Sequence, residues 1–186
     1  MRKLLIKLLE WLLDGQVAKK TKVVVATAAV ATTVGWMNPA VLKDLKQWEG
    51  FRGKAYIDIA GHPTQGYGHT NMAGGPKVDF NTIWTEEQAS RILQKDLIKY
   101  RDGVKRYVKV PLNNCQLSVL TMWTYNVGVG AMRKSSLVRR LNTGDYKSVP
   151  RKLMAWNKAR VRGKLVAVRG LTNRRKSEGN LWRKCK

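Results

Sequence analysis

The residues with the clearest potential for chemistry lie between positions 49 and 70, in the stretch EGFRGKAYIDIAGHPTQGYGHT. It holds two carboxylates, Glu49 and Asp58, nine positions apart, and a threonine, Thr64, six positions further on. If one carboxyl group keeps its proton while the other is ionised, such a pair can cleave a glycosidic bond. The protonated acid donates to the leaving oxygen, while the ionised partner supports the cationic sugar and orients or activates a water molecule. A threonine hydroxyl could hold that water. The same residues are also compatible with two ordinary solvated charges.

A helix is expected to position Glu49. Asn38 is a favourable N-cap and Pro39 suits the first helical position, so we predict a helix that begins there and ends at Gly50. Its apolar side is formed by Val41, Leu42, Leu45 and Trp48. Glu49 falls at the C-terminal end of that side, where partial burial and the negative end of the helix dipole disfavour the charged carboxylate. Glu49 is therefore the expected protonated partner.

The residues after this helix have the pattern of a β-hairpin. Residues 54–57 are typical of a strand, residues 58–63 of a turn, and residues 64–69 of a second strand thinned by glycine. A hairpin directly after the helix brings Asp58 and Thr64 back past the helix end. Asp58, in a polar turn, is expected to be ionised.

The rest of the chain is predominantly helical in pattern. Thr85 and Gln88 form a capping box, which predicts one long helix with an apolar side that extends to Tyr100. Further helices are predicted from Asn113 or Asn114 to Gly128, after Ser135 or Ser136, from Asp145 to Trp156, and from Thr172 to Trp182. The predicted fold class is α+β, in which residues 38–186 form a small hairpin lobe and a larger helical lobe with a cleft between them.

The charge of the chain predicts a polyanionic partner. There are 36 Lys and Arg against 12 Asp and Glu, a net charge of +24, and most of the excess lies after residue 100. Nucleic acid, anionic lipid and cell-wall polymer would all be attracted, and charge alone does not choose among them. Two histidines and two cysteines without ligand spacing disfavour a metal site, and we expect no cofactor. For Cys115 and Cys185 we favour free thiols over a bridge that ties the C-terminal tail to the domain.

The N-terminal 37 residues have the pattern of a membrane-associated appendage. Residues 1–14 predict an amphipathic helix, for which a membrane surface is favoured over a protein core. An uncharged run, Val23–Leu42, is just long enough to cross a bilayer but is weakly hydrophobic. Lysines upstream of the run place the N-terminus in the cytoplasm. A marginal transmembrane segment fits better than a cleaved signal peptide or a buried soluble helix.

The stretch that contains Glu49 resembles the active-site segment of the bacteriophage lysozyme family, the muramidases of glycoside hydrolase family 24. Glu49, Asp58, Thr64 and the GYGH sequence at 66–69 match the family pattern in type and spacing. Residues 125–146 and the GLTNRR sequence at 170–175 extend the resemblance, which covers roughly residues 40–182. It implies a lysozyme-like fold and hydrolysis of the β-1,4 bond between N-acetylmuramic acid and N-acetylglucosamine in peptidoglycan.

The resemblance also implies roles for individual residues. Glu49 would be the general acid, Asp58 the second carboxylate and Thr64 the hydroxyl that positions the water. Four further positions match residues of the family that support the site or contact substrate. Arg174 would pair with the catalytic glutamate, and His69 would be a structural histidine of the hairpin. Asn126 and Tyr67 would bind substrate.

The N-terminal segment resembles that of signal-arrest-release endolysins in character. The resemblance implies tethering in the host inner membrane, followed by release into the periplasm as a monomer. The basic sequence ARVRGKLVAVRG, at 159–170, is unusual for a loop between two helices, and could bind anionic lipopolysaccharide or wall polymer.

Three alternatives compete with a muramidase. One is a basic membrane-permeabilising protein with a vestigial lysozyme fold. A nucleic-acid-binding protein is disfavoured, because no recognised binding motif is found. A lytic transglycosylase would cleave the same bond without adding water, and the Asp58 and Thr64 partners favour hydrolysis instead.

Overall fold

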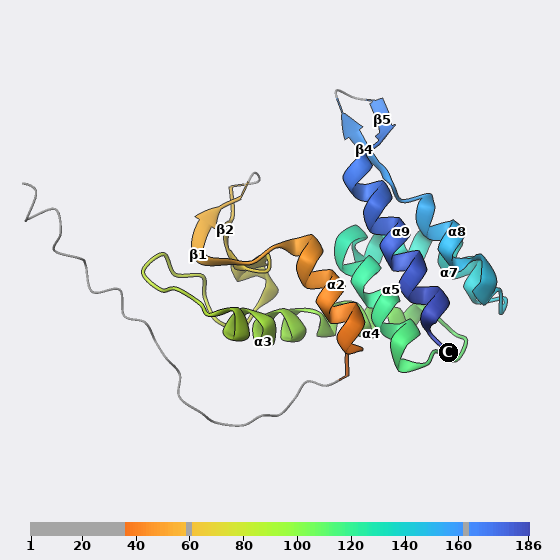
Figure 1. Ribbon diagram of the computed structural model, residues 1–186, viewed down its shortest axis with the longest axis horizontal. Helices are drawn as coiled ribbons and strands as arrows, with labels where there is room; N and C mark the ends of the chain where they lie inside the picture. The colour runs from red at the N-terminus through yellow and green to blue at the C-terminus, as the bar shows by residue number, and fades with distance from the viewer. Residues whose placement is uncertain (1–35, 59–60, 162–163) are drawn as a thin grey trace, which may run out of the picture.

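The chain folds into two lobes, one built on a small sheet and one of helices (Figure 1). The computed structural model describes residues 36–58, 61–161 and 164–186. The sheet has the strand order β1-β2-β3, with both neighbouring pairs antiparallel. A second antiparallel pair, β4 and β5, stands apart from it. The predicted α+β class, with a small hairpin lobe and a larger helical lobe, is confirmed.

The elements follow one another in this order: α2 (Pro39–Glu49), β1 (Arg52–Ile57), β2 (Pro63–Gly66), β3 (His69–Thr70), η1 (Asn71–Ala73), α3 (Glu86–Asp96), α4 (Ile98–Tyr107), α5 (Asn114–Val127), α6 (Val129–Lys134), α7 (Ser136–Leu141), η2 (Tyr146–Ser148), α8 (Val149–Met154), β4 (Lys158–Val161), β5 (Lys164–Ala167) and α9 (Arg169–Lys184).

Helix α2 forms for the reasons that its sequence indicates. The Asn38 side chain accepts hydrogen bonds from the backbone N–H groups of Ala40 and Val41, which caps the first turn. Val41 and Leu45 are completely buried, and the helix packs against α5. Gly50 ends the helix with a φ of 69°, a conformation that favours glycine. Glu49 is thus the last residue of a rigid, capped helix.

The region predicted as one second strand is two short strands in the structure. Strand β2 ends at Gly66 and β3 begins at His69, with a turn between them. Gly66 has a φ of 69°, and a Cβ there would lie 3.1 Å from the Ala89 Cβ and from the Trp84 ring. The close approach of α3 therefore requires glycine at this position, and the backbone reverses immediately after it.

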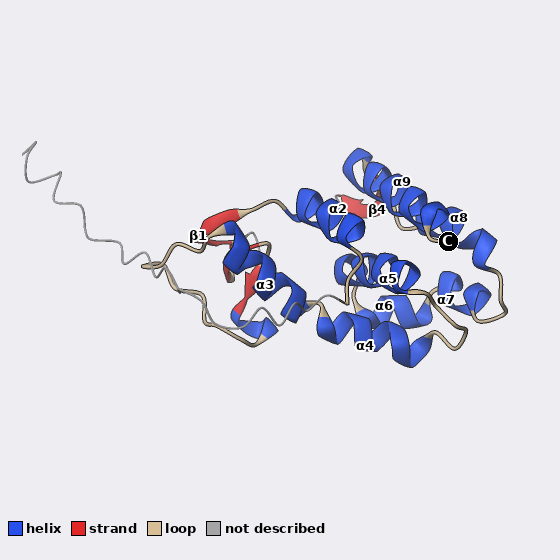
Figure 2. Ribbon diagram, turned by 60° about the horizontal axis from the view of Figure 1, so that its bottom comes forward, coloured by secondary structure: helices blue, strands red, loops and turns tan. Residues whose placement is uncertain are grey.

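The long helix predicted from Thr85 is divided at Leu97. Its capping box is present as expected, but α3 ends at Asp96 and α4 begins at Ile98. Helix α3 contacts β2 and β3, whereas α4 contacts α5 and α6. In Figure 2 the two helices run in different directions from this point. Because of this break, the first part of one continuous apolar pattern packs against the sheet lobe and the second part packs within the helical lobe.

The core of the helical lobe is centred on α5. Seven consecutive residues of this helix, 118–124, are buried, including Trp123, which packs edge-on against Trp156. Helix α9 lies against both α5 and α8. These contacts hold α9 beside α2 and so fix the two helices that form the site described below.

The expectation of free thiols is wrong, because Cys115 and Cys185 form a disulfide. The bond joins the first turn of α5 to the residue after α9, across a sequence separation of 70 residues. The Asn113 side-chain amide also donates to the backbone carbonyl of Lys186. The packing of α9 along α5 brings these ends together, which the spacing of two cysteines in the sequence does not reveal.

The basic segment expected to be a loop forms the hairpin β4–β5. Lys158 pairs with Ala167 and Ala159 with Val166. The hairpin projects from the beginning of α9, away from the helices (Figure 1). Val161 in β4 and Val166 in β5 supply the β-propensity that the high charge obscured.

The predicted membrane segment lies outside the described residues, apart from its end, where Val41 and Leu42 belong to α2. Among the helices that the structure describes, none has the length and apolar character needed to cross a bilayer.

Candidate active site

A pocket of about 360 Å³ lies where the two lobes meet. The helical walls come from the end of α2, the end of α3, the start of α4 and α5, and the opposite wall comes from the β2–β3 turn, β3 and η1. The residues that line it are Glu49, Gly68, Thr70, Met72, Ala73, Asp96, Lys99, Tyr100 and Tyr125. This pocket is the cleft predicted between the lobes.

Glu49 reaches this pocket with its carboxyl group held by Arg174. The Arg174 Nη2 atom donates to Glu49 Oε1 at 2.7 Å. The Glu49 side chain is 20% exposed and that of Arg174 only 7%, so the contact is largely shielded from solvent. The resemblance implied this pairing. It fixes the orientation of the carboxyl group.

Arg174 belongs to a buried charge cluster, which also contains Arg175 and Glu178 on the same helix. Glu178 Oε1 accepts from Arg175 Nη2 at 2.9 Å and from Arg174 Nε at 3.4 Å. Glu178 and Arg175 are both completely buried. Burial raises the pKa of Glu178 to about 7, although both guanidinium groups act in the opposite direction. Burial likewise lowers the pKa of Arg175.

Neither Glu178 nor Arg175 was predicted from the sequence as part of the site. A signal was available, because Glu178 is the only acidic residue after Asp145 in a strongly basic stretch. It also follows Arg174 by four positions and Arg175 by three, the spacings that bring side chains together on a helix.

Asn126 is connected to this cluster through Arg175. Its Oδ1 atom accepts from Arg175 Nη2 at 2.9 Å, while the residue itself is exposed at the end of α5. The remaining polar group of its side chain, the amide NH₂, is a donor.

Asp58 directly follows strand β1, and Thr64 lies in strand β2, on the other side of the hairpin turn. The Asp58 carboxylate accepts from the backbone N–H of His62 at 2.8 Å, and the Thr64 hydroxyl donates to the backbone carbonyl of His62 at 3.0 Å. Thr64 is buried. Among the described residues, the lining of the 360 Å³ pocket includes Glu49 but neither of these two.

Tyr67 lies at a second hollow, whose lining does not include Glu49. Its hydroxyl donates to Glu86 Oε1 at 2.7 Å, and both residues line this hollow of about 460 Å³ together with Leu42 and Phe51. Its backbone carbonyl accepts a hydrogen bond from the hydroxyl of Tyr125, which lines the first pocket.

Comparison with known proteins identifies the fold and the family. Residues 46–178 match the family described as phage lysozyme. The chain belongs to the phage lysozyme family. The endolysin of Acyrthosiphon pisum secondary endosymbiont phage 1 is 36% identical over 138 residues, which is 74% of this chain and 91% of that protein. The matched range contains every member of the Glu49–Arg174–Glu178 cluster.

Two further relatives support this assignment. The solved structure of the endolysin from Escherichia coli O157:H7 phage FAHEc1 superposes with a TM-score of 0.70 at 35% identity, covering 78% of this chain and 92% of that one. The SAR-endolysin of Escherichia phage Mu is 30% identical over 167 residues, 89% of this chain and 92% of that protein. The predicted lysozyme fold is confirmed, and the chain is a lysozyme-type hydrolase of the endolysin class.

In this phage lysozyme, His69 forms a buried pair with Asp96 beneath the pocket. The His69 Nδ1 atom lies 2.7 Å from Asp96 Oδ2, and Nε2 is 2.9 Å from the Pro76 carbonyl oxygen. Both nitrogens donate only in the charged imidazolium. Burial lowers the pKa of His69, but the bonds to Asp96 and Pro76 outweigh it, so the pKa is raised above its ordinary value of 6.5. His69 therefore links β3 to α3.

Replacing Asp96 by asparagine is expected to lower the free energy of unfolding by about 2 kcal/mol at about pH 5.5, because a charged hydrogen bond is lost. A raised native pKa means that the contribution is fully present below the unfolded pKa and is lost as the pH rises through the native pKa. The difference from wild type should therefore shrink at alkaline pH. Urea unfolding at about pH 5.5 and at alkaline pH measures the difference in free energy of unfolding. Asp102→Asn, at an exposed position, is the control. A difference that does not change with pH would contradict this interpretation.

The aromatic wall of the pocket was not predicted. The Tyr100 and Tyr125 rings meet edge to face with centroids 5.0 Å apart, and burial raises the pKa of Tyr125, keeping its hydroxyl neutral. Lys99, exposed beside them, adds a positive charge to the lining. Tyr100 comes from the helix that was expected to be continuous with α3, so the break at Leu97 is what places this wall.

Proposed function

We propose that this phage lysozyme is a muramidase that hydrolyses the β-1,4 bond between N-acetylmuramic acid and N-acetylglucosamine in peptidoglycan. The observation that carries the proposal is Glu49, partly buried at the wall of an interlobe pocket and held in place by Arg174. A saccharide in the pocket would meet apolar, aromatic and polar groups, as a ligand site requires.

Glu49 donates a proton to the leaving glycosidic oxygen. A glycan that fills the pocket expels water, and this desolvation favours the protonated form. Arg174 then stabilises the Glu49 carboxylate that remains after proton transfer, so the contact that orients the acid also stabilises its ionised form at the end of this step.

Asp58 supports the positive charge that develops on the sugar, and Thr64 holds the water. The glycosidic C–O bond breaks, the water oxygen bonds to the sugar carbon, and a proton of the water returns to the carboxylate pair. Both residues are anchored to the backbone of His62, so the hairpin carries them to the substrate as one unit.

Other residues of the site contribute binding or support. Asn126 offers its amide NH₂ to the substrate, because Arg175 already occupies its oxygen. Tyr67 acts through its backbone, which holds the hydroxyl of Tyr125 on the pocket wall. His69 joins the hairpin lobe to α3, and Arg174 holds the carboxyl group of Glu49 in place. No cofactor takes part.

The masses of the fragments released from purified peptidoglycan test this proposal. A muramidase adds one water per bond, so the products should carry reducing N-acetylmuramic acid ends. Products lighter by one water, with anhydro ends, would instead identify a lytic transglycosylase. Reducing N-acetylglucosamine ends would show that the enzyme cuts the alternate bond.

The location of the enzyme is a separate proposal. The segment 1–37 tethers the chain in the host inner membrane, and release delivers it as a monomer to the periplasm, where lipopolysaccharide is an additional anionic partner and nucleic acid is not. Its support is the similarity to the SAR-endolysin of phage Mu, which at 89% coverage extends upstream of Trp36. An uncoupler should move the full-length chain from the membrane to the soluble fraction, and a chain that is soluble beforehand would contradict tethering.

A further inference from the structure

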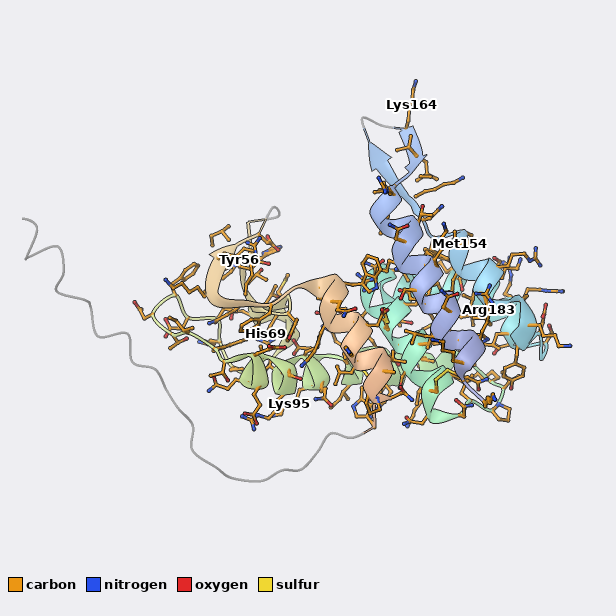
Figure 3. All side chains as sticks on the ribbon, in the orientation of Figure 1. Tyr56, His69, Lys95, Met154, Lys164 and Arg183 are labelled. Carbon is orange, nitrogen blue, oxygen red and sulfur yellow. A yellow bond between two sulfur atoms is a disulfide. The ribbon has the colours of Figure 1, made fainter. Side chains whose placement is uncertain are left out.

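The hairpin β4–β5 exposes aliphatic and basic side chains together. All four residues of β5, Lys164–Ala167, are exposed. Leu165 is 64% exposed and Val166 is 41% exposed. Figure 3 shows Lys164 at the far end of this hairpin, pointing away from the helices. Apolar side chains in such a position gain nothing from the core of the protein.

Both faces of the hairpin combine the two kinds of side chain. The pairing of Lys158 with Ala167 places them on one face with Leu165, whereas Lys164 and Val166 lie on the other. A two-stranded sheet has little stability of its own in water. A surface that covers the exposed aliphatic residues would therefore stabilise the hairpin.

The hairpin and the sequence on either side of it are rich in exposed basic residues. Lys158, Lys164 and Arg169, the first residue of α9, are exposed. The sequence has no acidic residue between Asp145 and Glu178, and Glu178 is completely buried. An anionic surface would be attracted to this end of the molecule.

We propose that the hairpin docks on the surface of an anionic phospholipid bilayer. Leu165 and Val166 enter the interface between head groups and acyl chains, and Lys158, Lys164 and Arg169 contact lipid phosphates. Aliphatic residues favour lipid over other polyanions. Nucleic acid is bound with aromatic stacking platforms, and residues 158–169 contain no aromatic residue.

A fluorophore on the hairpin tests this docking in the full-length chain. The variant Val166→Cys can be labelled selectively, because the chain's two native cysteines are bonded to each other. An environment-sensitive dye there should shift to shorter wavelength with phosphatidylglycerol vesicles and not with phosphatidylcholine vesicles. Lys95→Cys, exposed on α3 in the other lobe, is the matched label. It should not shift, even if the N-terminal segment attaches the chain to vesicles.

Charge variants identify the residues that dock. Replacing Lys158, Lys164 and Arg169 together by glutamine should weaken docking about 100-fold, since each basic residue near an anionic surface adds to the attraction. A matched triple variant neutralises Lys105, Lys134 and Arg139, which are exposed on α4, α6 and α7, and should retain the shift. Unchanged hydrolysis of soluble peptidoglycan fragments by both variants would show that the enzyme is folded.

Three results would overturn the proposal. They are an equal shift with phosphatidylcholine, equal docking by the two triple variants, and a shift seen only with lipopolysaccharide. Each is separate from the assignment of Glu49, because the readout is the hairpin dye rather than bond cleavage.

Discussion

Glutamine in place of Glu49 is expected to reduce kcat for peptidoglycan hydrolysis about 10³-fold, the range that loss of a general acid produces. Glutamine has nearly the same shape, and its oxygen can still accept the hydrogen bond from Arg174 that Glu49 accepts at 2.7 Å. What it lacks is a proton to give to the leaving oxygen. KM should change little, because the pocket lining keeps its shape.

Release of reducing ends from purified peptidoglycan measures this loss. Glu87→Gln, an equal change of charge at an exposed position of α3, is the matched control and should retain full activity. An unchanged melting temperature in Glu49→Gln would separate lost chemistry from lost folding. Undiminished hydrolysis by the folded variant would remove Glu49 from the mechanism. Undiminished lysis of whole cells without hydrolysis would point to membrane permeabilisation.

The position of Glu49 could be predicted because its causes are local. The Asn38 cap, the proline after it and the apolar side of the helix lie within a dozen residues, and the structure shows the helix with those bounds. The roles of Asp58 and Thr64 came from resemblance as well as spacing. The hairpin that carries them could be predicted from the sequence. The division of its second strand at Gly66 could not, because it depends on contact with Ala89 of α3.

The rest of the site depends on contacts between distant segments. Lys99 and Tyr100 reach the pocket only because the chain changes direction at Leu97, and the periodicity of a helix continues through such a break. The Cys115–Cys185 bond depends in the same way on the packing of α9 along α5. Sequence patterns describe the faces of helices, and they do not state which faces meet.

Glu178 is the clearest example of a residue whose importance comes from packing. A glutamate at this place in a basic, polar helix is expected to be exposed. In the structure it is completely buried and accepts hydrogen bonds from two guanidinium groups, one of which holds Glu49. The cluster thus connects the stability of α9 to the position of the proposed catalytic acid.

Replacing Glu178 by leucine is expected to lower the free energy of unfolding by about 3 kcal/mol, because it leaves the guanidinium group of the buried Arg175 without the oxygen that it contacts at 2.9 Å. Arg174 would lose one contact but keep Glu49. Glu178→Gln, which retains an oxygen acceptor, should be less damaging. The double variant Arg175→Met, Glu178→Leu removes both charges and should recover about 2 kcal/mol relative to the single leucine variant.

The pH dependence of this loss has a definite sign. The pKa of Glu178 is raised from 4.5 to about 7 by burial, so between these values the native state holds a proton that the unfolded chain releases. The free energy of unfolding of the wild type therefore falls as the pH rises through this window. A leucine variant has no titrating group at position 178 and lacks this pH dependence. The destabilisation should be larger near pH 5 than near pH 8. Urea unfolding at both pH values measures it, and a loss that grows with pH would show that pairing with the arginines outweighs burial.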